Sequence, residues 1–89
     1  MKLGVGPEKV KAMKPFDVVR VVRLRDKRFA DVAPDHERWP VVGDVGSILD
    51  VYTAPEPAFE IECSNPKDGS TIWLAAIYPE ELELVQPYP

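Results

Sequence analysis

Polar and apolar positions alternate along much of this chain with the period of β-strands, and runs of β-branched residues mark where strands lie. The stretches expected to be strands are 16–24, 43–52, 59–63, 71–78 and 83–85. Ten prolines in 89 residues disfavour long helices and punctuate the loops between these stretches. Pro79 and the two glutamates after it predict a single 3₁₀ turn before the last strand. The pattern therefore predicts an all-β protein.

The second strand opens with two glycines, Gly43 and Gly46, which predict a turn that enters a strand bulged or bent at Gly46. Val45, Ile48 and Val51 recur at every third position, and a bent barrel strand can place them on one face whereas a flat strand cannot. Closing the sheet also satisfies strand edges that would otherwise stay exposed. We therefore expect a small five-stranded SH3-like barrel.

The barrel domain is expected over residues 16–89, with a long first loop over 25–42. Residues 1–15 are expected to be an N-terminal extension in which 7–13 form a short helical turn. The side chains expected to fill the barrel are those of Val18, Val22, Leu24, Val45, Ile48, Val51, Phe59, Ile61, Ile72, Leu74, Leu82 and Leu84.

The strand over 71–78 is apolar on both faces, although a strand of an isolated barrel should be polar outside. Alternation assigns Ile72 and Leu74 to the core and leaves Trp73, Ala75 and Ile77 outside. An apolar patch of this kind is either covered by another part of the chain or exposed and prone to association. Its cover is the N-terminal extension (Val10, Ala12, Met13) or Trp39 of the long loop on one interpretation, and a partner or second copy on the other. The contact residues expected on the second interpretation are Trp39, Tyr52, Trp73 and Ile77.

Composition and charge exclude several classes of protein. One cysteine and one histidine cannot make an internal disulfide or a structural zinc site. No apolar run is long enough to cross a bilayer, and the first residues lack the apolar core of a signal peptide, so a cytoplasmic protein is expected. Residues 1–38 carry a net charge of +4 and residues 39–89 a net charge of −8. The two halves should interleave in one domain and neutralise each other, the alternative being that the asymmetry marks an acidic or basic binding face.

A basic segment is the one candidate for nucleic-acid binding, because lysine and arginine neutralise phosphates. Its residues are Arg20, Arg23, Arg25, Lys27 and Arg28. The whole chain carries a net charge of −4 and has a pI near 4.9, which weighs against this alternative.

No catalytic, cofactor or metal constellation stands out. Cys63 alternates inward and is expected to be a buried thiol, while His36 lies in the charged loop far along the chain from it. Glu60 and Glu62 are expected to be an outward-facing solubilising pair rather than an acid–base pair. The glycines of 43–46 are explained by turn geometry and not by a phosphate loop. The sequence therefore predicts a protein that is not an enzyme.

Four motifs in order resemble the bacterial domain-of-unknown-function family 4926: FDVV at 16–19, GDVGSI at 43–48, FEIEC at 59–63 and YPEEL at 78–82. The resemblance covers roughly 16–85, and the chain departs from it by the N-terminal extension and the longer first loop. It implies an SH3-like barrel and supplies no activity or catalytic residue. The GDVGSI element is also similar to SH3-like modules of nitrile hydratase β subunits, ribosomal KOW proteins and ferredoxin–thioredoxin reductase variable chains. Most of these modules are accessory or binding modules.

We therefore expect a small non-enzymatic module that acts through contact with an unidentified protein or by self-association, for example as an accessory, immunity or antitoxin-like partner. The alternative is a KOW-like RNA-binding module that uses the segment from Arg20 to Arg28.

Overall fold

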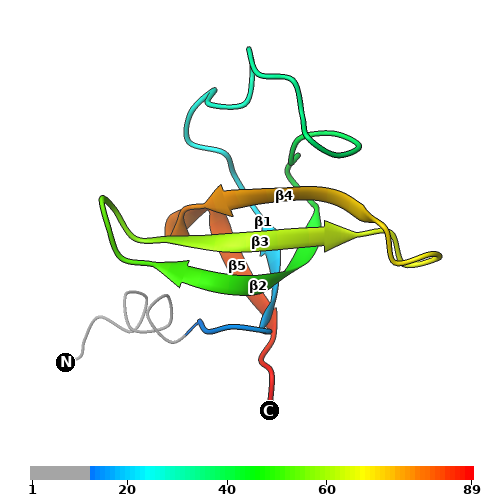
Figure 1. Cartoon of the computed structure of the whole chain (residues 1–89). Coiled ribbons are helices and arrows are strands. Elements are labelled where there is room, and N and C mark those ends of the chain that lie inside the picture. The colour runs from blue at the N-terminus through cyan, green and yellow to red at the C-terminus, as the bar shows by residue number, and fades with distance from the viewer. Residues whose placement is uncertain (1–12) are drawn as a thin grey trace.

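The computed structural model describes residues 13–89, which form one antiparallel five-stranded sheet and a single 3₁₀ turn (Figure 1). The elements follow in the order β1 (Val18–Val21), β2 (Val45–Tyr52), β3 (Ala58–Ser64), β4 (Thr71–Ile77), η1 (Pro79–Glu81) and β5 (Leu82–Gln86). The predicted all-β class, the five strands and the 3₁₀ turn before the last strand are confirmed. The helical turn predicted over 7–13 lies outside the described residues except for Met13. No helix in the described part of the chain is long and apolar enough to cross a membrane.

The sheet bends where β2 changes partners. Its strand order is β4-β3-β2-β1-β5, with every neighbouring pair antiparallel. Residues 45–47 of β2 pair with β1 and residues 47–52 pair with β3, so Ser47 belongs to both ladders. Figure 1 shows the result, with β2, β3 and β4 lying along a common axis in alternating directions and β1 and β5 crossing behind them at a steep angle. The bend turns one face of the sheet into a concave core.

Gly46 lies at this bend because no side chain fits there. It is buried, and a Cβ atom on it would lie 2.5 Å from the carbonyl oxygen of Glu62 and 2.8 Å from Cγ2 of Ile61. Of the bulge or bend predicted at Gly46, the bend lies there, whereas the shift of register that marks a bulge falls between Ile48 and Asp50. The glycine therefore allows the backbones of β2 and β3 to approach closely, and the bulge follows three residues later.

The variant Gly46→Ala is expected to lower the free energy of unfolding by about 1–3 kcal/mol, since the added methyl group overlaps a backbone atom that cannot rotate away. Urea denaturation measures the loss. Gly69→Ala is the matched control, because nothing lies within 4 Å of its Cβ position and only its positive φ of 77° is strained. Equal stability of Gly46→Ala and wild type would contradict the close approach.

The core gathers on the concave face of the sheet, and its members are Met13, Val19, Val21, Ile48, Phe59, Ile61, Cys63, Trp73, Ala75, Ile77 and Leu82. The inward prediction is confirmed for Ile48, Phe59, Ile61, Cys63 and Leu82. Leu24 and Ile72 are partly buried against this core. The prediction is wrong for a further set of residues, which are exposed or only half-buried: Val18, Val22, Val45, Val51, Leu74 and Leu84.

In strand β4 the buried and exposed faces are reversed relative to the prediction. Trp73 and Ile77 are 1% and 0% exposed, whereas Leu74 is 37% exposed and Ala76 shares its face. The indole nitrogen of Trp73 donates a hydrogen bond of 2.7 Å to a carboxylate oxygen of Asp44, which satisfies its polar group inside the protein. Because both faces of β4 are apolar, the strand still presents an apolar outer surface, which consists of Leu74 and Ala76.

Candidate binding pocket

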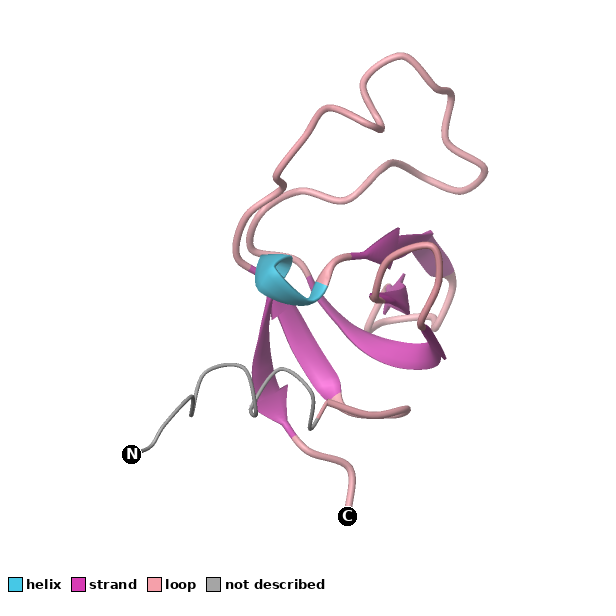
Figure 2. Cartoon of the chain, turned by 90° about the vertical axis from the view of Figure 1, so that its left-hand side faces the viewer, coloured by secondary structure: helices cyan, strands magenta, loops and turns pink. Residues whose placement is uncertain are grey.

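A pocket of about 600 Å³ opens on this outer surface of β4, within the size range of ligand sites. One wall comes from the long loop between β1 and β2, through Phe29, Val32 and Trp39. The floor comes from β3 and β4, and the third wall from the turn between β2 and β3. Figure 1 shows the long loop extending away from the sheet on the side of β4, and Figure 2 shows the same loop projecting beyond the strands. The backbone amides of Glu37 and Arg38 donate to the carbonyl oxygen of Ile72, which holds the loop against β4.

The carboxylate of Glu81 anchors the first half of the long loop. This side chain is completely buried and accepts hydrogen bonds from both terminal nitrogens of Arg28, at 3.1 and 2.7 Å, and from the amide of Arg25 at 2.6 Å. It also accepts from the amide of Tyr78 at 2.9 Å. Figure 2 shows that η1, which carries Glu81, lies at the base of the loop. Burial raises the pKa of Glu81, but Arg28 and these amides outweigh burial and leave the pKa below its usual value.

The carboxylate of Asp44 anchors the second half in the same way. Arg38 donates to both of its oxygens, at 2.8 and 3.0 Å, in a bidentate pair. The amide of Val41 donates at 3.0 Å, and the indole of Trp73 connects the same carboxylate to the core. Burial raises the pKa of Asp44, and the contact with Arg38 together with these N–H donors lowers it further than burial raises it. The loop is therefore fixed at both ends, although it contains no helix or strand.

Aromatic rings give the pocket its shape. Phe29 and Trp39 stack at a centroid distance of 4.8 Å, and the Trp39 indole donates to the carbonyl oxygen of Val32 at 2.5 Å. The ring of Tyr78 lies under the guanidinium groups of Arg25 and Arg28, at 3.3 and 4.6 Å from its centroid. These stacked arrangements hold the rings in place before any ligand arrives.

The third wall is the turn between β2 and β3. Tyr52 and Pro55 line the pocket, and the Tyr52 hydroxyl donates to the Glu60 carboxylate at 2.9 Å. That hydrogen bond raises the pKa of Tyr52. Glu56 forms an ion pair of 2.7 Å with Arg25, which ties this turn to the long loop. The Glu56–Arg25 ion pair therefore joins two walls of the pocket, the turn between β2 and β3 and the long loop.

The four predicted contact residues divide into two pairs. Trp39 and Tyr52 line the pocket, whereas Trp73 and Ile77 lie in the core and offer no surface. Their expected outward position is wrong because the facing of β4 is reversed. Sequence reasoning missed Phe29, Leu74 and Tyr78 as pocket residues. The apolar character of both faces of β4 was the signal for Leu74, but it could not say which face was outside.

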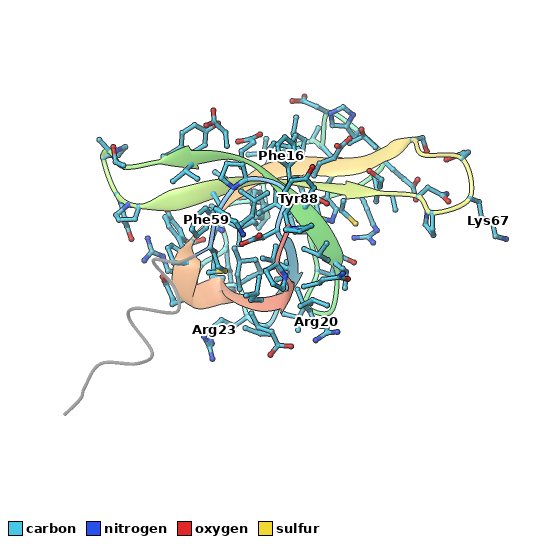
Figure 3. All side chains as sticks on the ribbon, turned by 90° about the horizontal axis from the view of Figure 1, so that it is seen from below. Phe16, Arg20, Arg23, Phe59, Lys67 and Tyr88 are labelled. Atoms are coloured by element: carbon cyan, nitrogen blue, oxygen red, sulfur yellow. The ribbon has the colours of Figure 1, made fainter. Side chains whose placement is uncertain are left out.

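The basic segment from Arg20 to Arg28 is largely neutralised within the chain. Arg20 pairs with Glu83, and Arg23 donates to the carbonyl oxygen of Glu80. Arg25 and Arg28 pair with the carboxylates Glu56, Glu80, Asp26 and Glu81. Among residues 13–89 the side chain of Lys27 makes none of these contacts. Figure 3 places Arg20 and Arg23 at the β1–β5 end of the molecule and Lys67 at the far tip of the β3–β4 hairpin, so Lys67 does not extend the basic segment.

The other chemical candidates differ in their burial. Cys63 is buried, and burial raises the pKa of its thiol, while His36 is exposed in the long loop. Glu60 and Glu62 face away from the core, as expected, and accept hydrogen bonds from the hydroxyls of Tyr52 and Thr71. Residues 13–89 contain no cluster of three or more His, Cys, Asp or Glu side chains that could hold a metal ion.

Acid is expected to destabilise the fold through Glu81, Asp44 and Asp17, whose folded pKa values all lie below their ordinary values. Their stabilising contribution is complete above the unfolded pKa values of about 4 and is lost as the pH falls through the folded values. The melting temperature should therefore be steady near neutral pH and fall below about pH 4. Calorimetry from pH 7 to pH 2 measures the melting temperature, which should fall less steeply with pH in Glu81→Gln than in wild type. A wild-type melting temperature that rises on acidification would contradict the assignment.

Comparisons of this chain with protein-family models, with curated proteins and with solved structures find no match. The functional interpretation therefore depends on the geometry of the pocket.

Proposed function

We propose that this chain is a non-enzymatic protein-binding module of SH3-like architecture, and that the pocket between the long loop and β4 is its contact surface. The observation that carries the proposal is the pocket itself, a recess of about 600 Å³ lined by Phe29, Trp39, Tyr52 and Leu74. Aromatic side chains are enriched where proteins bind one another. Trp39 and Tyr52 were expected at such a surface from the sequence.

Two further features support the proposal. The strand order, the partner change of β2 and the 3₁₀ turn before β5 are those expected of an SH3-like barrel. The long loop is fixed by Glu81 and Asp44, so little conformational entropy would be lost when a partner binds. The neutralised arginines of the same loop favour this function over RNA binding.

The test is selection of peptides from a random display library on the full chain, followed by affinity measurement on variants. Leu74→Gln should weaken the selected peptides by about tenfold or more, because a polar side chain then occupies the apolar floor of the pocket. Leu84→Gln is the matched control, since Leu84 is a strand leucine of similar exposure, 41% against 37%, outside the pocket lining. Circular dichroism melting of both variants checks that they fold.

Peptides whose affinity survives Leu74→Gln, or a library that yields no enriched peptide, would overturn the proposal. If Leu74→Gln fails to fold, Ala76→Gln places a polar group on the same floor and takes its place.

A further inference from the structure

We propose that the occupant of the pocket is a segment of a partner protein in which an apolar side chain is flanked by lysine or arginine. This inference rests on the proposed function and adds the chemistry of the partner. The apolar side chain enters the pocket over Leu74 and Trp39, and the basic side chains lie over the neighbouring outer face of β2 and β3.

That outer face carries three carboxylates at neighbouring positions of the β2–β3 ladder. Asp50 of β2 and Glu60 of β3 are directly opposite each other in the ladder, and Glu62 follows two residues later on the same face as Glu60. Glu60 itself lines the pocket. A cationic group over this face would therefore be adjacent to any side chain bound in the pocket.

The charge of these carboxylates is not compensated within the described part of the chain. No lysine or arginine of residues 13–89 forms an ion pair with any of the three. Glu60 and Glu62 accept hydrogen bonds from the neutral hydroxyls of Tyr52 and Thr71, at 2.9 and 2.6 Å. Like charges directly opposite in an antiparallel ladder destabilise it. An external cation over Asp50 and Glu60 would reduce this unfavourable interaction.

The arginines beside the pocket are already paired with carboxylates. Arg28 pairs with Glu81 and Asp26, and Arg25 pairs with Glu56 and Glu80. These two arginines face four carboxylates, so they leave no excess positive charge, and Glu60 and its two neighbours add to a negative potential at the pocket. Electrostatic complementarity then selects a partner that brings positive charge.

The same charges disfavour two other occupants. Residues 13–89 carry eight lysines and arginines against fourteen aspartates and glutamates, so a second copy of this domain would bring more negative charge to the site. A nucleic acid would bring a polyanion to the same carboxylates. A polypeptide segment with basic and apolar residues brings no negative charge to these carboxylates.

The experiment reads the composition of the peptides selected from a random library and tests their charge dependence. Enriched peptides should share an apolar residue with lysine or arginine within two positions of it. The double variant Glu60→Gln with Glu62→Gln should weaken them by about tenfold at low salt, because it removes two charges and keeps the acceptors for Tyr52 and Thr71. Wild-type affinity should fall as salt is added.

The matched control is Asp35→Asn with Glu37→Gln, which removes the same number of charges at the same spacing. Both residues are exposed in the long loop and lie outside the pocket lining, so this variant should keep wild-type affinity to within about twofold. A tenfold loss in the control would overturn the inference, because net charge alone would then explain the effect.

The remaining outcomes separate the two proposals. Selection of apolar peptides that lack basic residues would overturn the proposed partner chemistry but not the binding pocket. The same holds if affinity is unchanged in Glu60→Gln with Glu62→Gln and lost in Leu74→Gln. Peptides insensitive to Leu74→Gln overturn both. Sedimentation equilibrium that shows a dimer broken by Leu74→Gln, or tight retention of a random-sequence RNA pool, assigns the surface to another occupant and also overturns the inference.

Discussion

Replacing Glu81 by alanine is expected to lower the free energy of unfolding by about 3–5 kcal/mol, because it removes the fully buried carboxylate of an ion pair with the partly buried Arg28. The variant leaves Arg28 without its inner carboxylate and removes the acceptor for the amides of Arg25 and Tyr78. Each of these groups lies at the junction of the long loop and η1. Urea denaturation followed by circular dichroism measures the loss.

The control for this prediction is Glu80→Ala, one residue earlier in the same 3₁₀ turn. Glu80 is exposed and pairs with Arg25 at the surface, so its removal should cost less than about 1 kcal/mol. Glu81→Gln should fall between the two, since an amide oxygen still accepts hydrogen bonds but carries no charge. Similar losses for Glu80→Ala and Glu81→Ala would show that burial of the Glu81 carboxylate does not stabilise the fold.

The second large effect is expected from Trp73→Ala, which should cost about 3–5 kcal/mol because it empties the largest fully buried side-chain site of the described core. It also removes the indole donor to Asp44, and with it the connection between the core and the long loop. Trp73→Phe should cost less, since most of the ring volume remains. Thermal and urea denaturation both measure these losses.

The other tryptophan is the comparison for this prediction. Trp39→Ala truncates a half-buried ring in the pocket wall and should cost clearly less stability than Trp73→Ala. The reverse order would mean that β4 faces as the sequence suggested, with Trp73 outside. The pair of variants therefore tests the orientation of β4 directly.

The number of strands and their positions along the chain could be predicted from the sequence because turns and β-branched runs are local signals. The 3₁₀ turn at Pro79 and the positive φ of Gly69 in the β3–β4 loop follow from residue types that have few other uses. In β3, Glu60 and Glu62 alternate with Phe59 and Ile61, so the polar residues determine which face is buried. That strand was oriented correctly.

The buried face of β4 could not be predicted by alternation because apolar residues occupy both of its faces. In β1 the charged Arg20 shares its face with Val18 and so indicates Val19 and Val21 as the buried pair, and the prediction that placed Val18 inside went against this signal. In β4 there is no charged residue at all, and the deciding contact joins Trp73 to Asp44 across 29 positions of sequence. Such long-range contacts leave no periodic signal in the chain.

The pocket was predicted only in part for the same reason. Trp39 and Tyr52 stand out as aromatic residues near loops, but the walls depend on where Glu81 and Asp44 hold the long loop. Glu81 reads in the sequence as an ordinary acidic residue of a turn. Only its complete burial in the folded chain reveals it as the anchor.

The placement of the two indoles gives this protein a pair of separate optical reporters. With Trp39 replaced by phenylalanine, the emission comes from the ring enclosed beside Asp44, and it follows loss of the native interior. With Trp73 replaced instead, the fluorescence comes from Trp39, whose ring stacks on Phe29, and it reports binding of a partner in the pocket. Occupancy and unfolding can therefore be recorded independently, without attaching any dye.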